Sequence, residues 1–233
     1  IAAHQLQCDA ASIPYQGGHM LSADGRQISW SDIIELAHRQ IHGLPDGMDP
    51  GLASFDIMQV PTGGDLPKDG KVHMYPCYSF EFHLVLVAFD PIIGKPEIRS
   101  YTVGHDCGTV INPAIVSGMT YGGIAHGIGA ALLEEFAYDE SGQLMTQSFL
   151  DYLMPSSHEV PDIQLVKHCT PSPHTVFGQK GSGESGYLGA PAAIASAINH
   201  AVAGLDISFD KLPMRMSVIS DAIAAAQQRS DHQ

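Results

Sequence analysis

The chain has 233 residues, of which 44% are hydrophobic and 15% are charged, a composition typical of a globular domain. Lys and Arg total 11 against 25 Asp and Glu, which gives a formal net charge of -14. This acidity argues against nucleic acid and anionic membrane surfaces as partners, because affinity for phosphate is built mainly from Lys and Arg. The four scattered cysteines form no C-x-x-C pair, so we expect reduced thiols. No secretory signal is visible, and a cytoplasmic location is expected, with the periplasm left open.

Hydrophobic periodicity and turn residues predict the elements in chain order. Helices are expected over residues 1–9 (the end of a helix that began earlier), 30–42 with Ser31 as its cap, 113–135, 192–203 and 213–228. Strands are expected over residues 79–89, 97–103 and 163–168. Turns are expected at residues 22–27, 90–95 and 138–142, and an extended loop over residues 44–72. Helices and strands mix without a βαβ repeat, which favours an α+β fold.

One apolar stretch is long enough to resemble a membrane span. Residues 111–133 contain no formally charged side chain. They do contain Asn112, Pro113 and His126, and no Lys or Arg flanks them. We therefore predict a glycine-rich helix in a protein core and no membrane span.

The strongest local signal is a glycine-rich segment. Residues 178–186 hold four glycines and one carboxylate, Glu184. Successive N–H groups in such a loop suit a phosphate or an oxyanion, and a carboxylate held among them can act as a general base. A solvated turn without chemistry is the alternative. Gly181, Gly183 and Gly186 also match a dinucleotide fingerprint, but no buried strand precedes them and the next helix begins several residues later, which argues against a Rossmann site.

Thirteen histidines raise the question of a metal site. Only His38 and His42 have the i, i+4 spacing that places two ligands on one helix face. The residue after His38 is Arg39, so the zinc motif H-E-x-x-H is not matched. We predict no metal ligands in this chain and interpret the other histidines as core or surface residues.

Three segments together resemble the molybdenum hydroxylases, the family of xanthine dehydrogenase, aldehyde oxidase and carbon monoxide dehydrogenase. Residues 101–113 resemble the family's D-C-G-x-x-I-N-P segment, residues 116–129 its glycine-rich helix, and residues 178–186 its K-G-x-G-E loop. The resemblance implies that the chain, 1–233, is the C-terminal part of the molybdopterin-binding region of the large subunit, with the α+β fold of that region. Residues 1–75 would be an N-terminal helix and loop segment, and residues 76–233 the cofactor-facing part.

The resemblance also implies an activity. The enzyme would oxidise an aldehyde or an N-heteroaromatic carbon with oxygen derived from water. Glu184 would be the base that takes a proton from a hydroxyl group on molybdenum. The cofactor would be molybdenum–molybdopterin in its cytosine dinucleotide form. The implied cofactor-binding positions are Met119, Gln179, Lys180, Gly181, Ser182 and Gly183.

The sequence departs from the family pattern in two ways. Met119 stands where many relatives place a Gln after Gly118, and a thioether cannot donate the amide hydrogen bond. The N-terminal molybdenum domain is missing from these residues, and four scattered cysteines cannot ligate two [2Fe–2S] clusters.

We therefore expect an obligate complex. Its other chains would carry the N-terminal molybdenum domain, the [2Fe–2S] clusters, and FAD or another electron acceptor, and it would act on a small-molecule substrate. Two alternatives remain open at this point: a non-catalytic assembly subunit, and a nicotinamide-binding module that uses the G-S-G-E-S-G loop.

Overall fold

The computed structural model describes residues 1–58, 69–70, 75–90 and 92–231. Internal packing divides the chain into two units, Ile1–Gln59 and Val60–Gln233, whereas the sequence placed the boundary between residues 75 and 76. Residues 59–68 and 71–72 of the expected loop over residues 44–72 lie outside the described residues. The four cysteines are all free.

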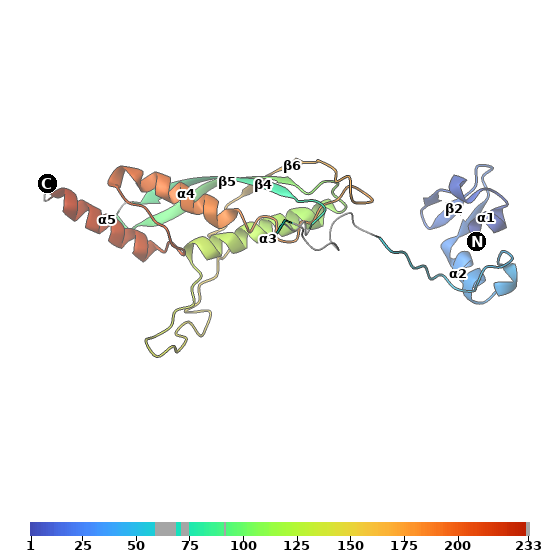
Figure 1. Ribbon diagram of the computed structural model, residues 1–233, viewed down its shortest axis with the longest axis horizontal. Coiled ribbons are helices and arrows are strands. Elements are labelled where there is room, and N and C mark those ends of the chain that lie inside the picture. The colour runs from blue at the N-terminus through green and yellow to red at the C-terminus, as the bar shows by residue number, and fades with distance from the viewer. Residues whose placement is uncertain (59–68, 71–74, 91, 232–233) are drawn as a thin grey trace. The chain divides into compact units, whose positions relative to one another are not determined.

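The first unit is a small α+β unit (Figure 1). Its elements are α1 (Ala2–Leu6), β1 (Tyr15–Gln16), β2 (His19–Leu21), β3 (Gln27–Ser29) and α2 (Trp30–His38), with short 3₁₀ turns at Ala10–Ser12 and Ile41–Gly43. The three strands form an antiparallel sheet in the order β1-β2-β3. This sheet was not predicted, because strands of two or three residues are too short to establish an alternating pattern.

Helix α2 corrects two predictions from the sequence. Its cap is Ser29 and not Ser31: the Ser29 hydroxyl accepts the N–H of Asp32, and the Asp32 carboxylate accepts the N–H of Ser29. The helix ends at His38 and not at residue 42. His42 lies in a separate 3₁₀ turn, so the two histidines do not share one helix face. Across the described part of the chain, no group of three or more His, Cys, Asp or Glu side chains is arranged to hold a metal ion.

The second unit contains a three-stranded sheet and three helices (Figure 1). Strands β4 (Phe80–Asp90) and β5 (Lys95–Asp106) form an antiparallel hairpin, and β6 (Ile163–His168) pairs with β5 in parallel. The helices are α3 (Pro113–Leu132), α4 (Ala190–Val202) and α5 (Met216–Asp231), with a 3₁₀ turn at Ala203–Leu205. The α+β class and the three predicted strands are confirmed, although β5 is longer at both ends.

The last helix begins three residues later than predicted. Pro213 has no N–H to contribute to a helix. The N–H of Met214 donates to the carbonyl oxygen of Ala131 at 2.7 Å, which attaches this segment to the end of α3. Helix α3 differs from its prediction only near its C-terminal end, whereas α4 begins at Ala190, two residues earlier than predicted, and ends at Val202. The predicted turn at residues 138–142 is confirmed by the bridge between Tyr138 and Leu144.

The core of the second unit lies between one face of the sheet and the three helices. Tyr101 and Val103 of β5 are fully buried there. The helices contribute the buried side chains Ile124, Ile128, Ala131, Ala190, Ile194, Ile198, Ile219 and Ile223. Helix α3 is therefore part of this core, as predicted for the glycine-rich stretch. None of the helices in the described ranges has the length and apolar character needed to cross a membrane.

The other face of β4 is apolar and exposed. Phe80, Phe82, Leu84 and Leu86 alternate along the strand and are each 59–66% exposed. We call these four residues the outer face of β4. The alternating pattern is present, but the side that points into the core carries Glu81 and His83 beside valines. Two polar residues at one end of the inward face therefore need polar partners.

Candidate functional site

The D-C-G turn at the end of β5 fixes the glycine loop. Asp106 Oδ1 accepts the N–H of Gly108 at 2.8 Å and the N–H of Thr170 at 3.1 Å. Lys180 Nζ lies 3.4 Å from the same oxygen. The N–H of Lys180 also donates to the Cys107 carbonyl oxygen at 2.8 Å. The start of the glycine loop is therefore bound to the end of β5.

The remaining motif residues of this segment also have local roles. Gly108 has φ of +67°, and a Cβ at this position would collide with the Gly178 carbonyl oxygen, so glycine is required. Asn112 Oδ1 caps α3 by accepting the N–H of Ala114 at 3.1 Å, and Pro113 is the first residue of the helix. The segment thus supplies an anchor, a tight turn, a cap and a helix start.

The Asp106–Lys180 pair is nearly closed to solvent, with side chains 10% and 6% exposed. Burial raises the pKa of Asp106, but hydrogen bonds from Thr170 and Gly108 and the charge of Lys180 outweigh it and hold that pKa well below its usual value. Lys180 Nζ also lies 5.2 Å from the centroid of the Phe80 ring. The ammonium group is therefore engaged in a structural link.

Glu184 lies in the part of this loop where the backbone donors are open. The residue is exposed, and no described residue forms a hydrogen bond with its carboxylate. Within the described ranges, no acceptor lies within hydrogen-bond reach of the N–H groups of residues 181–183. A Cβ on Gly181 or Gly183 would meet nothing within 4 Å. Consecutive open donors beside a carboxylate suit a ligand rich in hydrogen-bond acceptors.

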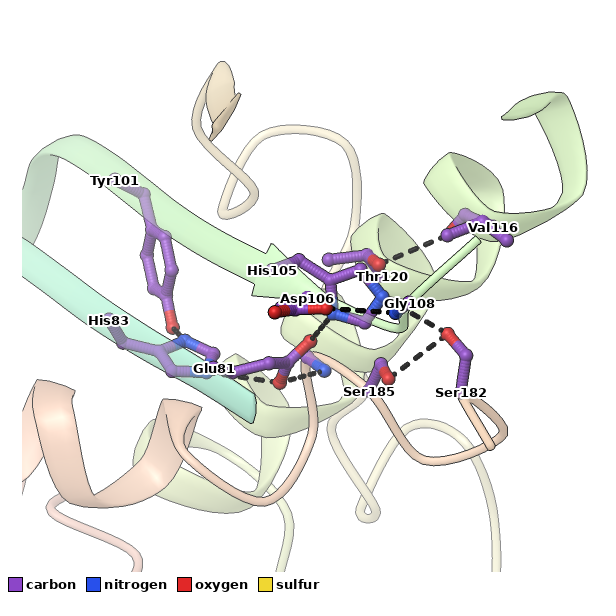
Figure 2. A network of polar contacts seen from close by, with 11 residues as sticks. Glu81, His83, Tyr101, His105, Asp106, Gly108, Val116, Thr120, Ser182 and Ser185 are labelled. Atoms are coloured by element: carbon purple, nitrogen blue, oxygen red, sulfur yellow. Dashed lines mark hydrogen bonds and ion pairs between the residues drawn. The ribbon is translucent and has the colours of Figure 1, made fainter. Parts of the chain in front are cut away.

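A second carboxylate, Glu81 of β4, contacts the same loop (Figure 2). Its Oε1 accepts a hydrogen bond from His105 Nδ1 at 2.7 Å, and the two residues are direct partners in the β4–β5 ladder. Its Oε2 accepts the N–H of Gly186 at 2.7 Å, and His83 Nε2 lies 3.4 Å from the same oxygen. His105 Nε2 lies 3.2 Å from Ser182 Oγ. The strand pair therefore holds the loop at two points.

Helix α3 approaches the loop through glycine. A Cβ on Gly123 would collide with the Ser185 carbonyl oxygen and would lie 2.8 Å from the backbone nitrogen of Tyr187. Gly186 has φ of +88°, and its Cβ would collide with the Thr120 carbonyl oxygen. Both glycines are therefore required by the close approach of two backbones.

This contact predicts that alanine is tolerated at Gly122 but not at the neighbouring Gly123. Gly123→Ala should push the loop away from α3 and destabilise it by about 1–3 kcal/mol, the usual cost of overpacking. Gly122→Ala is the matched control, because its Cβ would meet nothing within 4 Å. Hydrogen exchange of the Ser185–Tyr187 amides measures the effect. Equal exchange rates in the two variants would contradict the packing described here.

The structure separates the cofactor-binding positions that the sequence suggested. Residues 181–183 have open N–H groups, whereas both the N–H and the ammonium group of Lys180 are engaged within the protein. Gln179 Oε1 accepts the N–H of Phe177 at 3.1 Å. Met119 is 39% exposed and lies on α3 one turn before Gly123, on the same helix face.

Sequence reasoning missed Glu81, His83 and the loop contact of His105. The available signal was the pair of polar residues on alternate positions of an otherwise apolar strand. Their partner could not be identified, because Gly186 lies 105 residues after Glu81.

A cavity of about 680 Å³ opens beside the loop. Glu81 and Glu184 both line it. The remaining lining residues come from the segment before β4, from β4 and from the loop: Tyr75, Cys77, Tyr78, Ser79, His83, Gly181, Ser182, Gly183, Ser185, Leu188 and Gly189. Helix α4 begins only at Ala190, so the glycine motif does not join a strand directly to a helix as a dinucleotide fingerprint does.

Comparison with known proteins gives concordant matches. The family model of the molybdopterin cofactor-binding domain matches residues 1–161. The chain is 43% identical over 216 residues to the 6-hydroxypseudooxynicotine dehydrogenase complex subunit gamma of Paenarthrobacter nicotinovorans. It is 33% identical over 215 residues to the nicotine 6-hydroxylase large subunit of the same organism. These alignments cover 92% and 91% of this chain, and 25% of each relative.

The same likeness is seen in three dimensions. The crystal structure of quinoline 2-oxidoreductase from Pseudomonas putida 86 matches with a TM-score of 0.75 and 33% identity. The match covers 96% of this chain and 27% of that chain. The chain therefore spans about a quarter of the length of the curated relatives and of the solved structure that it matches.

Proposed function

Because the chain belongs to the molybdenum hydroxylase family, we propose that it forms part of an oxidoreductase that adds water-derived oxygen to an aldehyde or N-heteroaromatic carbon. The observation that carries this proposal is the exposed carboxylate of Glu184 beside the open N–H groups of residues 181–183. Matching relatives named for nicotine and quinoline favour an N-heteroaromatic substrate over an aldehyde.

The residues present fit a molybdopterin cofactor. Its pterin and phosphate groups are rich in hydrogen-bond acceptors, and residues 181–183 offer consecutive donors. Beside Met119, a Cβ on Gly118 or Gly122 would meet nothing within 4 Å, so this side of α3 leaves space for a ligand. When bound, the cofactor supplies the redox centre that accepts electrons from the substrate carbon. We propose the cytosine dinucleotide form.

Glu184 is the proposed general base. Its carboxylate lines the cavity and can accept a proton at either oxygen, since no described residue engages it. On one side the Ser182 hydroxyl contacts His105 of β5, and on the other the Gly186 N–H donates to Glu81 of β4, so the carboxylate is presented from a fixed loop. The chain thus contributes a base, hydrogen-bond donors and one wall of a substrate cavity.

The exposed apolar side chains on the outer face of β4 support the proposal that this chain binds a partner polypeptide. Its four large apolar side chains are more than half exposed, and such contiguous patches mark interaction surfaces. We propose that the polypeptide carrying the N-terminal molybdenum domain covers it. The [2Fe–2S] clusters, and FAD or another electron acceptor, would reside on further chains of the complex.

Molybdenum content and particle mass of the native complex test this proposal. We expect about one molybdenum atom per copy of this chain, in a particle well above the 24.9 kDa of the chain alone. A large particle without molybdenum, even after cofactor reconstitution, would favour a non-catalytic assembly subunit. Binding of NAD(P)H to the purified complex, abolished by changes in residues 181–183, would favour the nicotinamide alternative.

A further inference from the structure

We propose that Glu81, His105 and Ser182 are positioning residues that hold the loop around Glu184, and therefore its carboxylate, in one geometry. The inference rests on the proposed base role of Glu184 and adds the residues that fix the position of its carboxylate. Glu184 has no side-chain partner among the described residues, so its position depends on the loop backbone. Small displacements of a reacting group lower rates strongly, which makes the anchors of this backbone relevant to catalysis.

The loop is anchored on both sides of Glu184. Two residues earlier, Ser182 Oγ lies 3.2 Å from His105 Nε2. Two residues later, the N–H of Gly186 donates to Glu81 Oε2 at 2.7 Å. Because Glu81 Oε1 accepts the hydrogen bond of His105 Nδ1, both anchors meet at one carboxylate.

The anchoring groups are themselves rigidly placed. Glu81 and His105 lie on paired strands, and their side chains are only 13% and 2% exposed. Ser182 Oγ also lies 3.1 Å from Ser185 Oγ, and Ser185 is 7% exposed. Groups on packed strands hold a site more precisely than groups on loops do. The hairpin can therefore act as a fixed support for a loop that has no regular structure.

The arrangement requires an ionised Glu81. A carboxylate offers acceptors to several donors at once, and its charge strengthens each hydrogen bond. Burial raises the pKa of Glu81, but nearby His83 and the hydrogen bonds from Gly186 and His105 outweigh it and lower that pKa. Glu81 is therefore a carboxylate at neutral pH and accepts both hydrogen bonds.

Glu81→Gln tests the inference in the assembled enzyme with its full large subunit and partners. The amide presents one oxygen, which can accept from His105 or from Gly186 but not from both. We expect kcat to fall at least about ten-fold, with molybdenum content retained and KM changed much less. Glu97→Gln, an exposed carboxylate on the same hairpin, is the matched control and should keep the wild-type kcat.

Changes at Ser182 separate positioning from folding. Ser182→Ala removes the hydroxyl that contacts His105 and should lower kcat several-fold at full molybdenum content, whereas Ser182→Thr keeps a hydroxyl and should recover most of the loss. Ser100→Ala, an exposed serine on β5, is the control for Ser182→Ala. The double variant Glu81→Gln/Ser182→Ala should be little slower than the slower single variant, because both act through one loop. Independent effects would multiply.

The outcomes distinguish this inference from the proposed function. If Glu81→Gln and Ser182→Ala keep the wild-type kcat while Glu184→Gln is inactive, the positioning role is wrong and the base role stands. If Glu184→Gln keeps the wild-type kcat, the base role fails and the positioning role falls with it. If Glu81→Gln loses molybdenum and Ser182→Ala is unaffected, Glu81 serves folding alone, and the inference is overturned.

Discussion

Glu184→Gln in the assembled enzyme is expected to keep molybdenum but to lose turnover by about 10²–10⁴-fold, the usual contribution of a general base. The two side chains have nearly the same shape, the residue is exposed, and no described residue forms a hydrogen bond or ion pair with the carboxylate, so the fold should be unaffected. Single-turnover reduction by substrate measures the chemical step directly. The acid limb of the pH profile of kcat/KM, which reports ionisation of the base, should disappear in the variant.

A matched control for Glu184→Gln lies in the same unit. Glu140 is an exposed carboxylate near the tip of the turn between Tyr138 and Leu144, away from the glycine loop in sequence. Glu140→Gln should have the wild-type rate. Near-normal turnover in Glu184→Gln, at full molybdenum content, would remove Glu184 from the reaction and favour an assembly role for this chain.

The main elements of the second unit could be predicted because their patterns are long. The burial of strand β4 alternates from Phe80 to Val87, and α3 begins with a cap and a proline that can be recognised in the sequence. Both signals are local, so they do not depend on knowing the partner segments. The three strands of the first unit have no such length, and their pairing could not be deduced from two or three residues each.

The candidate site was predictable only in part, for the same physical reason. The glycine loop and Glu184 are contiguous in sequence, so their combination is visible. The network of Glu81, His105 and Gly186 joins residues 24 and 105 positions apart, and nothing local reveals it. The pattern of β4 would suggest the opposite orientation of the strand. Its larger apolar side chains lie on the outer face of β4, and its polar residues face inward.

Asp106→Asn should release the start of the glycine loop from β5. The substitution removes the charge that Lys180 faces, and the ammonium group is left 6% exposed without a counter-charge. Breaking a buried pair from one side usually costs about 3–5 kcal/mol. We therefore expect the Thr109 and Lys180 amides, which bridge the turn and the loop, to exchange at least about a hundred-fold faster. Hydrogen exchange of the assembled protein resolves this local opening.

The sign of the pH dependence follows from the direction of the Asp106 pKa. Because that pKa is lowered in the folded protein, the carboxylate's contribution to stability is fully present above the ordinary pKa of an aspartate, about 3.9. This contribution to stability is lost as the pH falls below about 3.9 and through the lower pKa that Asp106 has in the folded protein. Exchange protection of the wild-type loop should therefore be constant at neutral pH, apart from the intrinsic exchange rate, and should be lost only in acid.

Two further variants show whether the pair acts as a unit. Lys180→Met removes the cation and leaves Asp106 with the N–H groups of Gly108 and Thr170, so it should cost less than Asp106→Asn. The double variant should lose less protection than the sum of the single variants, because no unpaired charge remains buried. Arg99→Gln is the control, since it breaks an ion pair on β5 whose side chains are more than half exposed. A loss of loop protection in that control equal to the loss in Asp106→Asn would mean that general charge, and not the buried pair, holds the loop.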